Sequence, residues 1–135
     1  MITYQKSLNG ILQGDLTGFF EGWKPPVSPE KHLEILNNSY KVILALDGNK
    51  VIGFINAISD KLLSAYIPML EVLPEYRGKG IGKELVNRML GELKKFYMVD
   101  LCCDEELSGF YEKIGMRKSA GMIKRNYDAL IELKK

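Results

Sequence analysis

The segment from Val72 to Lys83 restricts the fold of this chain more than any other stretch. An apolar run at residues 65–72 stops before Pro74, and apolar residues then recur at helical spacing within residues 78–93. Proline has no backbone N–H to give to a sheet ladder, so the strand is expected to end there. The segment therefore lies at a strand-to-helix junction.

Glycines and basic residues surround the predicted start of this helix. The glycines are Gly78, Gly80 and Gly82, and the basic residues are Arg77, Lys79 and Lys83. The first amides of a helix have no partner within it, and the helix dipole favours a negative group at this end. Glycines let an anion reach the backbone because no Cβ stands in the way. The segment predicts a site for a phosphate or a diphosphate.

The spacing of these glycines does not fit the common nucleotide-binding loops. A P-loop needs four residues between its first glycine and a Gly-Lys pair that precedes Ser or Thr. Here Gly78 is one residue too close to Gly82, and Glu84 follows the lysine. A dinucleotide fingerprint would need its third glycine at the position of Lys83. The diphosphate must belong to another kind of ligand.

Length and composition set the class of protein. The chain has 135 residues, the size of one domain, which we expect to cover residues 1–135. Its 46% hydrophobic and 27% charged residues are ordinary for a globular protein. The net charge of +2 is too small to indicate a nucleic-acid partner. No apolar run approaches the roughly 20 residues of a membrane helix, and the start resembles no signal peptide, so we expect a cytoplasmic protein without a membrane partner.

The remaining pattern predicts an α/β sandwich with a mixed sheet. Strands are expected at residues 2–6, 41–46, 51–58, 65–72 and 96–102, with one or two more within 116–127. Helices are expected at residues 28–36, 78–93 and 105–114, and a broken one at 7–23. Residues 47–50 form a hairpin turn. The end of the chain, from residue 127, is expected to be an amphipathic tail that packs on the domain or on a second copy.

Cysteine and histidine indicate no metal or disulfide chemistry. Cys102 and Cys103 are neighbours, which makes a bond between them strained, and His32 is remote in sequence. We expect both cysteines to be small buried residues in a reducing compartment. Glu21, His32 and Asp60 are expected at the surface without a role.

Two motifs resemble those of the GCN5-related N-acetyltransferase (GNAT) superfamily. The first is Arg77-x-x-Gly80-x-Gly82, after a strand that ends in Leu70-Glu71-Val72. The second starts at Asp104 and continues with Phe110-Tyr111-Glu112-Lys113-Ile114-Gly115-Met116. One expected strand separates them, and together they cover residues 66–116.

The resemblance implies both a fold and an activity. The fold is a three-layer α/β sandwich with a mixed, mostly antiparallel sheet, splayed between the fourth and fifth strands, and helices on both faces. The activity is transfer of the acetyl group of acetyl-CoA to a primary amine, on a small molecule or a peptide, by direct attack in a ternary complex without a metal. The alternative is a non-catalytic module of the same fold that binds or senses acyl-CoA. The sequence is compatible with a homodimer.

By resemblance, acetyl-CoA is held along one strand and at the helix start. Its pantetheine arm would pair with the strand backbone near Leu70 and Val72, and its pyrophosphate would bind at residues 77–82. The residues implied in binding are Leu70, Val72, Arg77, Gly78, Lys79, Gly80, Ile81, Gly82, Lys83, Asp104, Phe110 and Lys113.

The resemblance also implies Tyr111 as the proton donor to the departing thiolate, since a phenol has a pKa near 10. The base that deprotonates the amine stays open. Glu71 is a candidate, but its strand parity differs from that of Tyr66 unless a bulge re-aims it, and Asp104 or a water relay are alternatives. Phe20 and Trp23, with Tyr66, either bind the acceptor or fill the core.

Overall fold

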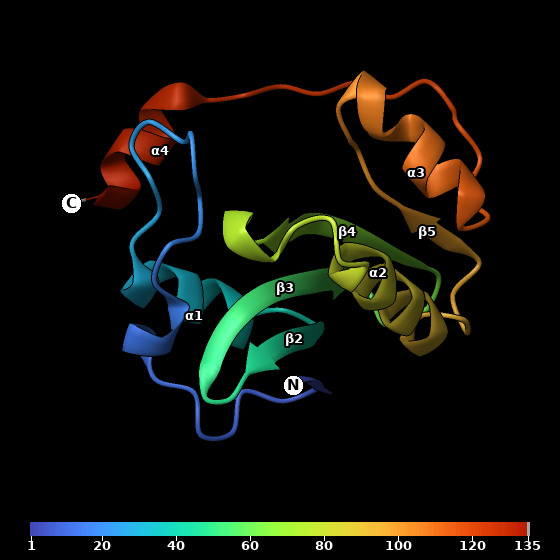
Figure 1. Cartoon of the computed structure of the whole chain (residues 1–135). Helices are drawn as coiled ribbons and strands as arrows, with labels where there is room; N and C mark the ends of the chain where they lie inside the picture. The colour runs from blue at the N-terminus through green and yellow to red at the C-terminus, as the bar shows by residue number, and fades with distance from the viewer. Residues whose placement is uncertain (135) are drawn as a thin grey trace.

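The computed structural model describes residues 1–134 and is built around a five-stranded sheet (Figure 1). In sheet order the strands are β1 (Ile2–Gln5), β2 (Lys41–Asp47), β3 (Lys50–Ser59), β4 (Ser64–Val72) and β5 (Met98–Asp100). Neighbours among β1 to β4 pair in antiparallel fashion, and β5 joins β4 in parallel. The mixed, mostly antiparallel sheet is confirmed, as is the hairpin between β2 and β3.

Helices lie between and after these strands. They are α1 (Pro29–Asn37), α2 (Ile81–Glu92), α3 (Ser108–Lys113) and α4 (Tyr127–Lys134), with short 3-10 turns η1 (Gln13–Leu16), η2 (Pro74–Tyr76) and η3 (Glu105–Leu107). α1 begins as expected, because the Ser28 hydroxyl accepts a hydrogen bond from the Lys31 amide at 3.2 Å and Pro29 occupies the first turn. The described residues contain no helix that is both long and apolar enough to cross a membrane.

Two adjacent residues of β3 show that helices cover both faces of the sheet. A Cβ on Gly53 would lie 3.2 Å from the side chain of Leu85 on α2. The ring of Phe54 lies 4.3 Å, between centroids, from the ring of His32 on α1. Because successive residues of a strand point to opposite faces, α1 and α2 pack on opposite sides. The expected three layers are confirmed, and the middle of β3 is buried throughout.

The sheet opens between β4 and β5. Their parallel pairing extends only from Ser64 and Met98 to Tyr66 and Asp100. Beyond this point β4 pairs with β3 alone, as far as Val72. The splay expected between the fourth and fifth strands is confirmed, and it leaves one edge of β4 without a strand partner.

A β-bulge interrupts β4 beside this opening. The register moves from Ile58 opposite Tyr66 to Asn56 opposite Met69, so β4 contains one residue more than β3 over this stretch. Residues opposite each other in an antiparallel pair share a face of the sheet. The bulge therefore puts Tyr66, Met69 and Glu71, which pairs with Phe54, on the face that carries α1.

Some expected elements are shorter or absent. The strand expected at 96–102 is reduced to β5, and the broken helix at 7–23 is reduced to η1. The strands expected within 116–127 do not form: residues 117–126 are exposed and pair with no strand of the described chain. Without a neighbouring edge, an extended segment has no ladder to join. The expected tail forms α4, whose Leu130 packs against the core.

Candidate active site

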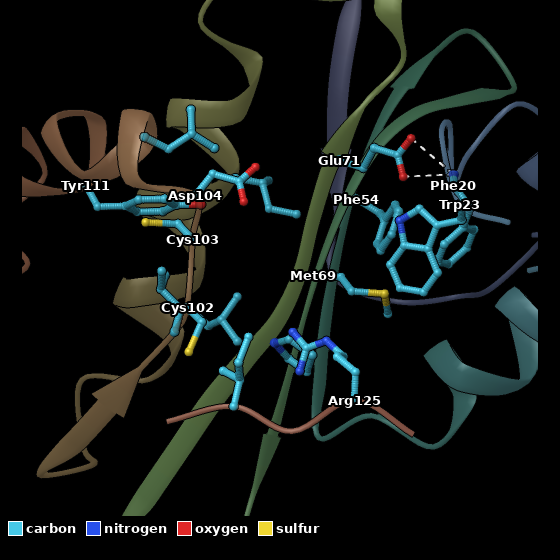
Figure 2. Close-up of a pocket in the computed structure, with 16 residues that line it drawn as sticks. Phe20, Trp23, Phe54, Met69, Glu71, Cys102, Cys103, Asp104, Tyr111 and Arg125 are labelled. Atoms are coloured by element: carbon cyan, nitrogen blue, oxygen red, sulfur yellow. Dashed lines mark hydrogen bonds between the residues drawn. The ribbon is translucent and has the colours of Figure 1, made fainter. Parts of the chain in front are cut away.

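A cavity of about 330 Å³ occupies the opening between β4 and β5 (Figure 2). Its lining residues come from the free half of β4, the loop after β5, α3, the loop before α1 and the tail before α4: Phe20, Trp23, Phe54, Ile67, Pro68, Met69, Leu70, Glu71, Leu101, Cys102, Cys103, Asp104, Leu107, Tyr111, Ile123 and Arg125. The cavity thus lies along the strand edge that the sheet leaves unpaired, where backbone groups are free to bind an extended ligand.

Tyr111 on α3 forms part of one wall. Figure 2 shows it with Asp104 and Cys103 on the side opposite Glu71. The ring is half-buried, and burial, together with the nearby Cys103 thiol, raises the pKa of Tyr111 above its ordinary value of 10. The phenol therefore keeps its proton at neutral pH and can donate it into the cavity.

Glu71 forms part of the opposite wall and holds the loop before α1. Both of its carboxylate oxygens accept the Phe20 backbone N–H, at 2.9 and 3.1 Å. Phe20 has φ of 65°, a left-handed backbone that is uncommon outside glycine and needs support from its surroundings. By strand parity alone, Glu71 and Tyr66 would lie on opposite faces of β4. The bulge puts them on the same face. Glu71 thus connects the reactive end of the cavity to the loop that carries Trp23.

The aromatic residues of this loop divide between core and cavity. Phe20 is 3% exposed and contacts His32 at 4.9 Å between ring centroids, so it fills the core while bordering the cavity. Trp23 is 45% exposed and stacks edge-on against Phe20 at 5.1 Å. Trp23 is therefore the ring that a ligand can reach.

The sequence suggested that His32 lies at the surface, but this was wrong. The residue is fully buried. Its ring lies among those of Phe19, Phe20 and Phe54, and neither nitrogen has a hydrogen-bond partner among the described residues. Desolvation lowers the pKa of His32 to about 4, so the ring is neutral at pH 7. The sequence placed His32 at the surface by default; in the structure Leu36, one turn later, shares its buried face.

The prediction of buried cysteines was also wrong, since Cys102 and Cys103 are both exposed and free. β5 ends at Asp100, so the cysteines lie in the loop that diverges from β4 and not inside a strand. Partial desolvation and the neighbouring Asp104 carboxylate raise the pKa of the Cys103 thiol. A thiol that holds its proton more tightly is a poor nucleophile at neutral pH.

The start of α2 is open. Gly78 and Gly80 have φ of 78° and 81°, and a Cβ on either would meet nothing within 4 Å. Gly80 is the N-cap, and no side chain caps the helix. Gly82 is nearer to β4, since its Cβ would lie 4.0 Å from Val72. The first amides of α2 are accessible to an anion.

The basic residues beside this helix start differ in their surroundings. The Arg77 guanidinium donates from Nε to the Val72 carbonyl at 2.9 Å and lies 3.3 Å from a Glu21 carboxylate oxygen. Lys79 lies over the Tyr76 ring, with Nζ 5.4 Å from its centroid. Lys83 is exposed. Arg77 therefore fixes the end of β4 against the loop, while the lysines leave positive charge at the surface.

Only some of the predicted site residues line the cavity. It brings together Phe20, Trp23, Leu70, Glu71, Asp104 and Tyr111. Other predicted residues lie outside its lining: Tyr66, Val72, Arg77, Gly78, Lys79, Gly80, Ile81, Gly82, Lys83, Phe110 and Lys113. Tyr66 forms the last pair between β4 and β5. The pKa of its phenol is raised by a hydrogen bond with Cys102 and by burial. Among the described residues no group of three or more His, Cys, Asp or Glu gathers to hold a metal.

Met69 and Arg125 are among the lining residues that the sequence reasoning missed. Met69 faces it because of the bulge, for which Pro68 is the one hint in the sequence. Arg125 reaches it because the tail crosses the opening, which no local pattern indicates.

Residues 8–116 match the model of the acetyltransferase (GNAT) family. The chain belongs to this family. The GNAT resemblance drawn from the two motifs is thereby confirmed.

Solved structures of GNAT proteins resemble the chain along most of its length. A proposed acetyltransferase from Deinococcus radiodurans R1 is 44% identical, with a TM-score of 0.91 over 94% of this chain and 90% of that one. A GNAT-family acetyltransferase from Streptococcus pneumoniae TIGR4 is 31% identical, with a TM-score of 0.76 over 94% and 99%. An uncharacterized N-acetyltransferase of Pyropia yezoensis is 27% identical over 103 residues, which are 71% of this chain and 59% of that protein. The chain thus spans less than two thirds of this relative.

Proposed function

We propose that this GNAT protein transfers the acetyl group of acetyl-CoA to a primary amine, by direct attack while both substrates are bound. One observation carries the proposal: the unpaired edge of β4 runs from the open start of α2 to a cavity that contains Tyr111 and Glu71. The acceptor is an amine on a small molecule or a peptide, and the proposed site of action is the cytoplasm.

The residues present fit the donor substrate, which would supply an activated thioester. The amides at Gly80 to Gly82 would bind its diphosphate, because no side chain caps them and no Cβ fills the space at Gly80. The edge of β4 at Leu70 and Val72 would hold the amide-containing arm. This arrangement would place the reacting end between the two walls of the cavity.

Side chains on opposite walls would handle the two protons of the reaction. Tyr111 would protonate the departing thiolate, in keeping with a raised pKa that holds its proton in place. Glu71 would accept a proton from the acceptor's ammonium, directly or through water, with the lone pairs that Phe20 leaves free. The neutral amine would then attack the thioester carbonyl. A covalent relay through Cys103 is not proposed, because the pKa of this thiol is raised.

The test is release of free thiol when the protein is mixed with acetyl-CoA and a panel of primary amines. We expect thiol release that depends on both the amine and the protein, and binding of coenzyme A measurable by calorimetry. Binding without thiol release across the panel would favour the non-catalytic module instead. Absence of coenzyme A binding would overturn the proposal.

A further inference from the structure

The tail before α4 crosses the mouth of the cavity. On the side of β5, a Cβ on Gly121 would lie 3.9 Å from the Cys102 sulfur. Further along, Ile123 and Arg125 line the cavity, and Leu133 of α4 borders a second hollow beside α1. The segment therefore spans from one wall of the opening to the other, and it brings Arg125 in front of β4, on the side of Met69 and Trp23 (Figure 2).

Arg125 has an electrostatic neighbour but no hydrogen-bond or ion-pair partner among the described residues. Its charge partly offsets the raised pKa of the Tyr66 phenol. Its guanidinium forms no hydrogen bond or ion pair with any residue that the structure describes, unlike Arg77 and Arg88. In Figure 2 its side chain extends from the tail in front of β4, beneath Met69, and it lines the cavity at its mouth. A guanidinium is always charged, and its planar donors match a carboxylate or a phosphate in pairs. An unused guanidinium in a candidate active site is a ready receptor for such a group.

The other charged residues of the cavity are negative and would attract a positively charged group. Glu71 and Asp104 are its carboxylates, and they come from the two walls that carry the proposed chemistry. No described carboxylate lies within 4.0 Å of the Arg125 guanidinium. The cavity thus offers negative charge where an ammonium would react and positive charge at its mouth.

We infer that the acceptor carries an oxyanion, a carboxylate or a phosphate, in addition to its primary amine, and that Arg125 binds this oxyanion at the mouth of the cavity. The inference rests on the proposed function and deepens it, because it names the class of amine: amino acids and related zwitterions rather than simple alkylamines or polyamines. Trp23, exposed on the same cavity, would cover the carbon skeleton between the two charged groups.

Matched pairs of acceptors test the inference in the wild-type protein. Thiol release is measured with lysine against cadaverine, tyrosine against tyramine and β-alanine against ethylamine, and O-phosphoethanolamine separates phosphate from carboxylate. We expect kcat/KM to be about 10- to 100-fold higher for the anionic member of at least one pair, the range for a hydrogen bond to a charged group. Thiol release that is equal within every pair overturns this inference and leaves the proposed function standing. No release with any amine removes both.

Variants then assign the effect to Arg125. Arg125→Gln should lower kcat/KM for the preferred anionic acceptor to about that of its neutral counterpart and leave the neutral one unchanged. Arg125→Lys should restore part of the preference, because it keeps the charge and loses the paired donors. Lys124→Gln is the matched control, since Lys124 is exposed on the same tail but does not line the cavity. A preference that survives in Arg125→Gln contradicts the assignment.

Discussion

At the scale of single residues, the proposed chemistry depends on two side chains that line the same cavity from different elements. Tyr111 comes from a short helix late in the chain, and Glu71 from the strand beside the opening. The phenol is held protonated by burial, whereas the carboxylate keeps lone pairs for a proton although it accepts the Phe20 amide. A donor and an acceptor of protons thus face the same space.

Replacing Tyr111 with phenylalanine tests the donor. The ring would still pack against Phe110, with which it now makes an edge-on contact at 4.9 Å, so the fold should be kept. We expect Tyr111→Phe to lower turnover by roughly 10²–10⁴-fold, the usual contribution of a general acid. Coenzyme A affinity, measured by calorimetry, should stay unchanged. A loss of turnover below tenfold would leave Tyr111 as a packing residue only.

Glu71 needs two variants, because it is both a proposed base and the anchor of a loop. Glu71→Gln keeps an oxygen for the Phe20 amide, and Glu71→Leu removes it. We expect both to lower kcat/KM by about 10²-fold or more, since neither can take a proton. Fluorescence of Trp23, the only tryptophan, should shift in the leucine variant alone. A glutamine variant as active as wild type would show that Glu71 is an anchor and not a base.

At the scale of elements, the start of α2 is the proposed site for the donor's diphosphate. Its N-cap is a glycine in the left-handed region, and a longer residue there would be strained as well as bulky. The effect of a substitution on stability therefore has to be separated from its effect on binding.

Comparing Gly80→Ala with the control Gly10→Ala separates the effect on stability from the effect on binding. Both glycines have nearly the same φ, 81° and 79°, and at neither would a Cβ meet anything within 4 Å. We expect both variants to lose a similar, small amount of stability in thermal unfolding, about 1–2 kcal/mol. Gly80→Ala alone should also weaken coenzyme A binding in calorimetry, because the methyl group stands where the diphosphate would lie. Equal coenzyme A affinity in the two variants would move the diphosphate away from α2.

At the scale of the whole molecule, the early loop, α1 and the sheet meet in an aromatic cluster that encloses His32. An uncharged imidazole fits there, but an imidazolium would find no hydrogen-bond acceptor among the described residues. The cluster lies directly behind the cavity, because Phe20 and Phe54 belong to both. The stability of the fold and the shape of the site should therefore respond together to acid.

Stability should fall as the pH decreases from about 6.5 to about 4. Below pH 6.5 the unfolded chain binds a proton at His32, whereas the folded chain resists it until its lowered pKa of about 4 is reached. The resulting loss should be about 2 kcal/mol at pH 5 and about 3 kcal/mol below pH 4. His32→Leu should lose less stability over this range in urea unfolding. An identical pH dependence in the two proteins would rule out His32 as the source.

The sequence predicted those features that depend on local chemistry. The junction at residues 72–83 follows from its own glycines and proline, and Tyr111 and Asp104 followed from a family motif. Features that depend on distant partners were missed. His32 is buried because a loop folds its aromatic rings over α1, and the cysteines are exposed because β5 stops two residues before them. The family match also ends at Met116, which leaves the course of the tail unpredicted.

The tail lies outside the part of the chain that matches the GNAT family model. The stretch that matches the GNAT family model, residues 8–116, contains the sheet opening, the helix start, Glu71 and Tyr111. Arg125 lies outside this stretch, on the tail before α4 that crosses the mouth of the cavity. On the proposed function, mutations in this tail should change the class of amine that is accepted without changing the residues proposed to bind the donor. Grafting the tail between relatives should then transfer the preference for an acceptor.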